Sequence, residues 1–302
     1  MKHIRTWIQV IWTALTNGYV FGYLKGTLYR GKWKKLCVPG LNCYSCPGAV
    51  GSCPIGALQS VLGKHNRSIS WYMIGFFLLV GSIFGRFVCG FLCPFGLIQE
   101  GLHKVPILKR FKRKNLPGHR WLKYLKYGIL IVFVILLPLY AVDQFGGGAP
   151  AFCKWLCPSG TLMGGWIQSI RQPQLRRVLG VLFAWKSIVL IGLLLLSMFV
   201  YRPFCKYLCP LGAVYSVFNP VAFYHMELQR EACISCGKCT RSCPMGIAVM
   251  EHPNDPECIR CGKCIGSCPE HCLKIHFGLH KNKGPERENL GGADGDGRTG
   301  CL

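Results

Sequence analysis

The most constraining feature of this 302-residue chain is a cysteine pattern that occurs twice near its C-terminus. Both runs read C-x2-C-x2-C-x3-C-P, the first at residues 233–244 and the second at residues 258–269. Three closely spaced thiolates can hold one iron–sulfur cube, and the fourth cysteine, which precedes proline, leads the chain to the other cube. The spacing therefore predicts two [4Fe–4S] clusters. Cluster I would be held by Cys233, Cys236, Cys239 and Cys268, and cluster II by Cys258, Cys261, Cys264 and Cys243.

The remainder of the chain is too apolar for an ordinary soluble domain. The sequence is 51% hydrophobic and only 16% charged, which indicates membrane-spanning segments. Four apolar segments are candidates for transmembrane helices, at about residues 6–24, 69–88, 126–142 and 180–201. At this length the 20 cysteines indicate metal ligation by reduced thiolates and not a disulfide scaffold.

Charge is distributed very unevenly along the chain. Before Glu227 the only acids are Glu100 and Asp143, against 26 Lys and Arg. These cations flank apolar segments and do not follow one recognition helix, so we expect membrane lipid, and no nucleic acid, as a partner. The most basic loop follows the second apolar segment, which places it and both termini in the cytoplasm. We therefore expect a multi-pass protein of the plasma (cytoplasmic) membrane.

A short motif, Cys-Pro-x-Gly, follows each of the four apolar segments. The last three copies are extended to C-x3-C-P by a preceding cysteine, and this indicates a duplicated two-helix unit with halves near residues 1–110 and 120–215. Alternating helix direction places the second and fourth copies on the inner membrane face. Four thiolates there would suit a [2Fe–2S] or [4Fe–4S] cluster, and the alternative is four unliganded thiols. The predicted inner site consists of Cys89, Cys93, Cys205 and Cys209.

The outer face allows two interpretations. In the first, the loop after the first apolar segment holds one metal centre by itself, through Cys37, Cys43, Cys46 and Cys53. In the second, Cys37 and Cys43 form a disulfide, and the site consists of Cys46, Cys53, Cys153 and Cys157. Cys272 and Cys301 match no motif.

Together these features predict a mainly α membrane protein with a small α+β domain of the bacterial 2[4Fe–4S] ferredoxin type. Residues 1–226 would form the four-helix membrane domain, residues 227–278 the ferredoxin domain, and residues 279–302 a disordered tail. The expected cofactors are the two [4Fe–4S] clusters, one or two further iron–sulfur clusters in the membrane domain, and quinone.

The motifs at residues 37–47, 53–56 and 91–96 resemble those of NapH-type membrane ferredoxins, which are related to the membrane parts of NosR-type proteins. The resemblance implies four spans, a pair of [4Fe–4S] clusters, and a role as a quinol dehydrogenase or electron-relay subunit. The family's C-x3-C-P motifs correspond to Cys89/Cys93 and Cys205/Cys209. The loop at residues 37–53 and the pair Cys153/Cys157 depart from that pattern, which suggests cofactors on both faces.

We therefore expect a membrane-bound iron–sulfur protein that relays electrons between the cytoplasmic clusters and the quinone pool or an extracytoplasmic partner. Its partner would be a redox protein or reductase subunit. If the chain is an enzyme, it is a quinol dehydrogenase-type oxidoreductase subunit, whose catalytic residues are unknown. The alternatives are a redox-sensing membrane regulator and a ferredoxin that assembles a metal cofactor in another enzyme.

Overall fold

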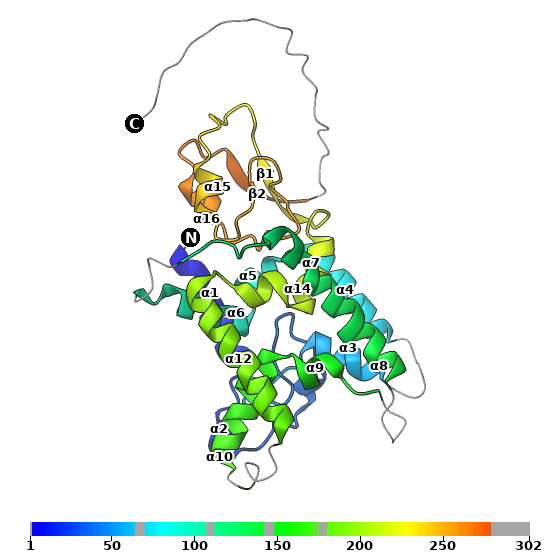
Figure 1. Cartoon of the computed structure of the whole chain (residues 1–302). Helices are drawn as coiled ribbons and strands as arrows, with labels where there is room; N and C mark the ends of the chain where they lie inside the picture. Colours follow the sequence, from blue (N-terminus) through cyan, green and yellow to red (C-terminus); the bar gives the residue numbers. More distant parts are fainter. Residues whose placement is uncertain are drawn as a thin grey trace, which may run out of the picture.

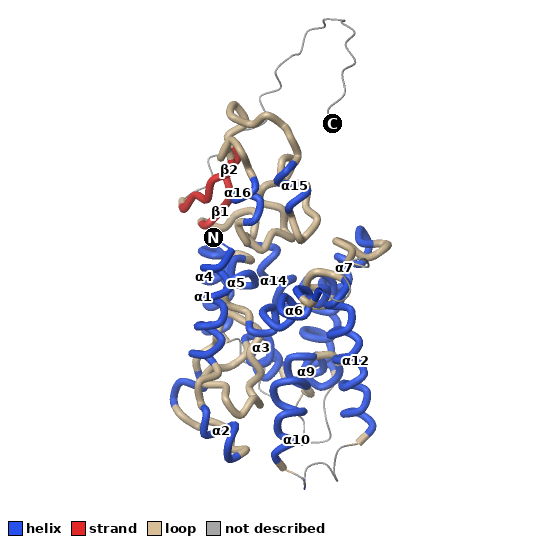
Figure 2. The backbone as a smooth tube through the Cα atoms, turned by 90° about the vertical axis from the view of Figure 1, so that its left-hand side faces the viewer, coloured by secondary structure: helices blue, strands red, loops and turns tan. Residues whose placement is uncertain are grey.

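The computed structural model describes residues 2–63, 70–106, 112–141, 148–172, 174 and 180–278, and all structural statements below concern these residues. A helical part is followed by a small domain that contains a two-stranded sheet (Figure 1). This small domain lies at one end of the helical part, next to α5, α7 and α14, in both views (Figures 1 and 2). The opposite end of the helical part carries α2 and α10.

The helical part is built from short helices and two long ones. In chain order they are α1 (Lys2–Thr16), α2 (Val20–Lys25), the 3-10 turn η1 (Lys32–Lys35), α3 (Pro54–Leu62), α4 (Trp71–Phe84), α5 (Phe87–Phe91), α6 (Pro94–Lys104), α7 (His119–Ile129), the π-helical η3 (Leu130–Leu136), α8 (Leu137–Tyr140), α9 (Ala151–Trp155), the π-helical η4 (Gly160–Trp166), α10 (Ile167–Arg171), α12 (Val181–Phe199), α13 (Pro203–Tyr207) and α14 (Pro210–Phe218).

The Cys-Pro-x-Gly motifs begin helices. Cys53, Cys93 and Cys209 are the N-cap residues of α3, α6 and α14, and the proline that follows each of them is the first helical residue. Proline suits this position because its fixed φ is already helical and its missing N–H has no partner in the first turn. Each motif thus places a cysteine where a helix starts and where free backbone N–H groups face the side chain.

Two helices are long and apolar enough to cross a membrane. The segment His119–Tyr140, which joins α7, η3 and α8, has 22 residues, and α12 has 19. The other two predicted spans are shorter in the structure. The predicted segment 6–24 is interrupted between α1 and α2, and α4 has 14 residues before Gly85, whose φ of 52° ends the helix. A bilayer requires about 20 residues, so the four-span arrangement stays a prediction.

The apolar residues of these helices point away from the interior. Only 22% and 17% of the apolar windows in the two long helices are buried. The shorter helices share this property, since Trp7 on α1 is 66% exposed and Trp71 on α4 is 77% exposed. Exposed apolar surface of this extent marks contact with a membrane or another protein.

The C-terminal domain has internal symmetry that follows the repeated cysteine run. Strands β1 (Tyr224–Leu228) and β2 (Leu273–Phe277) pair antiparallel, with Leu228 opposite Leu273. Between them lie α15 (Lys238–Ser242) and α16 (Lys263–Ser267), each preceded by a glycine in the left-handed region, at φ 68° and 71°. The two helices are joined by a 2.7 Å hydrogen bond between the hydroxyls of Ser242 and Ser267.

The outward apolar faces lead to a simple prediction. We expect the full chain to remain in the membrane pellet after a high-salt wash and an alkaline carbonate wash, because apolar burial in lipid is insensitive to both. Immunoblotting of an epitope-tagged chain measures this. Release of most of the protein by salt alone would mean that the apolar helices contact protein and not lipid.

Candidate metal centres

The eight cysteines of the two C-terminal runs divide into two groups around two small cavities. Cys233, Cys236, Cys239 and Cys268 line the first cavity. Cys243, Cys258, Cys261 and Cys264 line the second. The fourth cysteine of each run therefore lies with the first three of the other run, which is the division that the spacing predicts.

The surroundings of these cysteines suit a buried cluster. The second cavity is otherwise lined by apolar side chains that include Met226, Ile247 and Ile259. Burial raises the pKa of Cys258 to about 12, so its free thiol is protonated at neutral pH. A metal centre removes that proton when it binds, and sets of four thiolates in apolar surroundings are the donors of [4Fe–4S] clusters. The residues present thus fit the group that the motif predicts.

A ninth cysteine stands beside the first group. Cys272 immediately precedes β2 and lines the same cavity as Cys233 and Cys268. Its Sγ atom is 3.2 Å from Sγ of Cys268, within hydrogen-bond distance for sulfur. The residue matches no motif, but it follows Cys268 by only four residues and so lies beside the first group.

The four cysteines of the predicted inner site also lie together. Cys89 and Cys205 belong to the short helices α5 and α13, while Cys93 and Cys209 cap α6 and α14. Their exposed fractions are only 5–8%, and each thiol interacts electrostatically with at least one of the others. Polar N–H groups face the sulfur atoms: the backbone N–H of Gly212 donates to Cys209 (3.3 Å), and the Gln99 amide donates to Cys205 (3.4 Å).

Two buried arginines connect the halves of the chain at this inner site. Arg86 and Arg202 each stand three residues before the first cysteine of a C-x3-C-P motif, and both are fully buried. The Arg86 guanidinium donates to the carbonyl of Cys205 (3.1 Å), and the Arg202 guanidinium donates to the carbonyl of Cys89. Each arginine therefore binds the cysteine segment of the opposite half.

The glycines of the two inner motifs make room for these arginines. A Cβ atom at Gly212 would lie 3.3 Å from the Arg86 guanidinium, and one at Gly96 would lie 3.1 Å from that of Arg202. A larger side chain at either position would press on the arginine of the other half. The fourth residue of Cys-Pro-x-Gly is thus explained by tertiary packing at both inner motifs.

Carboxylates balance the two arginines. Glu257, the residue before Cys258, pairs with Arg86 (2.6 Å) and with Lys126. Burial raises the pKa of Glu257, but Arg86 and Lys126 lower it more, and the result is a pKa below the ordinary value. On the other side, Arg202 pairs with Glu100 (3.0 Å).

The outer cysteines are arranged differently from both predicted sets. Cys53, Cys153 and Cys157 line one cavity, as in the second set, but Cys43 joins them in place of Cys46. The backbone N–H of Cys46 donates to the carbonyl of Cys43 (3.1 Å), so a tight turn separates these two residues. Cys37 lies apart, beside Ser52 and Met73, and is not in a disulfide with Cys43.

Within the described residues, no group of three or more His, Cys, Asp or Glu side chains is arranged to hold a single metal ion. The two arginines were not predicted from the sequence, although the sequence contains a signal for them. Both inner motifs read R-x2-C-x3-C-P, whereas the outer motif at Cys153 has Pro150 in place of the arginine. No comparable sequence motif indicates that Cys43, and not Cys46, lines the outer cavity.

Two family models of iron–sulfur proteins match the chain. A family model described as "4Fe-4S dicluster domain" matches residues 225–269. A second model, described as "4Fe-4S binding domain", matches the helical part at residues 52–72, 69–115, 125–177 and 182–222. No solved structure matches the chain.

Relatives extend over most of the chain. The uncharacterized protein MJ0750 of Methanocaldococcus jannaschii is 34% identical, over 76% of this chain and 88% of its own length. The methylamine utilization ferredoxin-type protein MauN of Paracoccus denitrificans is 26% identical, over 56% of this chain and 50% of its own length. The regulatory protein NosR of Pseudomonas aeruginosa is 29% identical, over 53% of this chain and 20% of its own length.

These matches define an iron–sulfur electron-transfer protein. The chain belongs to the family of 4Fe-4S binding proteins whose model covers its helical part, and the resemblance to NapH- and NosR-type ferredoxins is confirmed. The chain spans only half of the length of MauN and a fifth of that of NosR.

The Glu257 ion pairs predict a stability effect. Glu257→Ala leaves Arg86 and Lys126 buried without their carboxylate, which costs about 3 kcal/mol. We expect a lower thermal unfolding midpoint for the variant in detergent, measured by intrinsic fluorescence. Glu251→Ala, at an exposed carboxylate of the same domain, is the matched control and leaves the midpoint unchanged. Equal midpoints for the two variants would contradict the assignment.

The position of Cys272 predicts a redox effect. Hydrogen bonds to ligand sulfurs raise the reduction potential of an iron–sulfur cluster, because they stabilise the more negative reduced state. Cys272→Ala should therefore retain the iron content and lower the potential of one cluster, as measured by potentiometric EPR. Cys37→Ala, which removes a thiol far from both C-terminal runs, should leave both potentials unchanged. Loss of a cluster from Cys272→Ala would instead make Cys272 a ligand.

Proposed function

We propose that this chain is a membrane-bound relay that carries electrons between its C-terminal clusters in the cytoplasm and a redox partner at the other side of the membrane. The observation that carries the proposal is the contact between the ligand loop of cluster II and the inner cysteine group. When bound, the clusters supply one-electron transfer. The chain's own residues fix the order and the surroundings of the sites.

The C-terminal domain is seated directly on the inner cysteine group. A Cβ atom at Gly90, which lies between Cys89 and Cys93, would be only 2.4 Å from the carbonyl oxygen of Ile259. Ile259 follows Cys258 and precedes Cys261, so the ligand loop of cluster II packs against the backbone of the inner site. This contact supports the order cluster I, cluster II, inner site.

Polar contacts hold the domain in this position. The Asn219 amide donates to the carbonyls of Asp255 (2.7 Å) and Cys258 (3.0 Å), and its oxygen accepts from the backbone N–H of Arg86 (3.1 Å). Arg260, inside the cluster II loop, donates to the carbonyl of Phe84 (3.1 Å). These hydrogen bonds fix the position of the C-terminal domain on the helical part. The distance between cluster II and the inner cysteine group is therefore also fixed, as an electron relay requires.

The membrane placement rests on charge and apolar surface. The helices α1, α4, α7 and α12 all direct large apolar side chains outward. Trp121 and Tyr124, near the start of α7, are 83% and 60% exposed, as is typical of residues at a membrane interface. We propose four spans as a duplicated two-helix unit, with both termini in the cytoplasm. The reciprocal contacts of Arg86 and Arg202 support the duplication.

The partner at the other side of the membrane is a redox protein, with quinone as a second candidate. Both would exchange electrons with the helical part and not with the C-terminal domain. The two are distinguished by turnover with a soluble quinol analogue, which a strict protein-to-protein relay does not support.

The inner site provides the direct test of the relay. We expect the anaerobically purified wild-type chain to contain more iron and sulfide than the roughly eight irons of two C-terminal cubes. Cys205→Ser should lose about four irons, or two for a [2Fe–2S] centre, while the C-terminal EPR signals remain. Cys37→Ser is the control for removal of a buried thiol and retains the full content. A wild-type content of about eight irons would exclude clusters in the helical part.

A further inference from the structure

We propose, as an extension of the relay proposed above, that Cys43, Cys53, Cys153 and Cys157 hold a further [4Fe–4S] cluster in the outer cavity. The cavity has a volume of about 670 Å³ and lies between α3, α9 and the loop that follows η1. Three separate segments of the chain supply the four thiols. This set differs from both sets that the sequence predicts.

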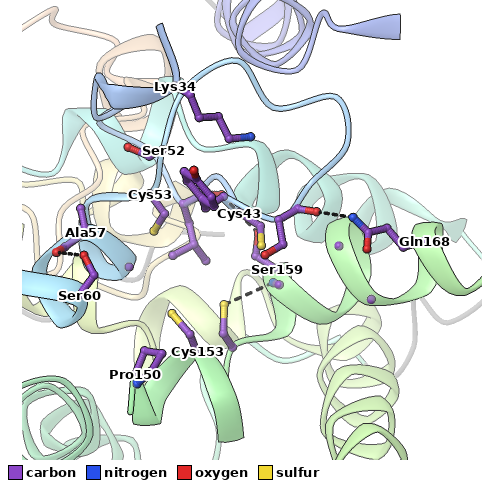
Figure 3. Close-up of a pocket in the computed structure, with 18 of the residues that line it drawn as sticks. Lys34, Cys43, Ser52, Cys53, Ala57, Ser60, Pro150, Cys153, Ser159 and Gln168 are labelled. Carbon is purple, nitrogen blue, oxygen red and sulfur yellow. Dashed lines mark hydrogen bonds between the residues drawn. The ribbon is translucent and has the colours of Figure 1, made fainter. Parts of the chain in front are cut away.

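The four sulfur atoms converge on one space. Figure 3 shows the thiols of Cys43, Cys53 and Cys153 at the cavity wall. A Cβ atom at Gly160 would lie 3.6 Å from Sγ of both Cys157 and Cys43, so these two sulfurs are at most twice that distance apart. The Cys153 thiol interacts electrostatically with the other three. The backbone N–H of Gly160 donates to Cys157 (3.3 Å), as that of Gly212 does to Cys209 at the inner site.

Three lysines, Lys34, Lys35 and Lys186, give the cavity a positive wall. The Lys186 ammonium donates to the carbonyl of Cys153 (3.1 Å). Lys34 is 5% exposed and donates to the carbonyl of Ala49 (2.7 Å). Keeping an ammonium group buried is costly unless a negative charge compensates it. A cluster with four thiolate ligands supplies that charge.

The neighbouring cysteines Cys37 and Cys46 are not among the described residues that line the cavity, and each has contacts of its own. Cys46 is fully buried on the other side of the turn, where Sγ is 3.3 Å from the Tyr23 hydroxyl. Cys37 Sγ is 3.6 Å from the Ser52 hydroxyl and 3.8 Å from Sδ of Met73. Cys43 and Cys46 therefore allow a controlled comparison. They are three positions apart, and we expect Cys43 to be a cluster ligand and Cys46 not to be one.

One loop joins the outer cysteine group to the inner one. The backbone of Leu41 hydrogen bonds to the side chain of Cys93, and Leu41 also lines the outer cavity. Cys43 is two residues after Leu41, so their Cα atoms are at most about 7 Å apart. The hydrocarbon core of a membrane is roughly 30 Å thick. The two cysteine groups are thus neighbours inside the helical part, and no long gap separates them.

The experiment compares Cys43→Ser with Cys46→Ser in the full chain, purified without oxygen. Two C-terminal, one inner and one outer [4Fe–4S] cluster give about 16 irons per wild-type chain. We expect Cys43→Ser to fall to about 12 irons and to lose one EPR or Mössbauer component, while Cys46→Ser keeps all of them. Cys153→Ser should reproduce the loss. The C-terminal signals report in every variant that the protein is folded.

Other results would overturn the outer site. If Cys46→Ser loses a cluster and Cys43→Ser does not, the ligand set is wrong. A wild-type chain with about 12 irons, in which Cys205→Ser still loses a cluster, lacks the outer cluster but keeps the relay. Rapid alkylation of Cys43 and Cys153 in the native wild-type chain, measured by mass spectrometry, would show free thiols and also reject the site.

Discussion

The structure depends on two buried guanidinium groups, each of which binds a backbone carbonyl in the other half of the chain. A buried charge costs several kcal/mol unless it is paired and hydrogen bonded. Arg86 finds its carbonyl partner in the second half, at Cys205, and Arg202 finds its own in the first half, at Cys89. Neither half can satisfy its own arginine alone, so the two halves form one folding unit. The same exchange brings four thiols together and surrounds them with positive charge.

The electrostatic setting of the cysteine groups changes along the molecule. The inner group stands between two arginines whose charges are partly neutralised by Glu257 and Glu100. The outer group faces lysines, whose ammonium groups bind carbonyls and not carboxylates. Because local charge and hydrogen bonds set cluster potentials, two sites with the same ligands need not have the same potential. When neighbouring clusters differ in reduction potential, the electron resides preferentially on the cluster with the higher potential.

The sequence predicted local chemistry better than long-range placement. Two cysteine runs with fixed spacing determine their own loops, so the grouping around both C-terminal cavities follows from the sequence alone. The inner group was predicted because a repeat implies symmetry. The choice of Cys43 over Cys46 depends on a turn whose orientation is set by distant contacts, such as the Asn42 amide on the carbonyl of Thr16 (3.3 Å). Helix interruptions near Gly18 and Gly85 were also missed, since apolar composition continues through them.

The seating of the C-terminal domain on Gly90 has a consequence for biogenesis. With that domain in place, the inner thiols are enclosed by both halves of the helical part and by the Ile259 backbone. Their exposed fractions are only 5–8%, so little of these thiols is accessible in this closed state. For the inner cluster proposed above, loading before the C-terminal domain docks would avoid reopening this contact. Translation supplies this order, because the helical part precedes the covering domain in the sequence and leaves the ribosome before it.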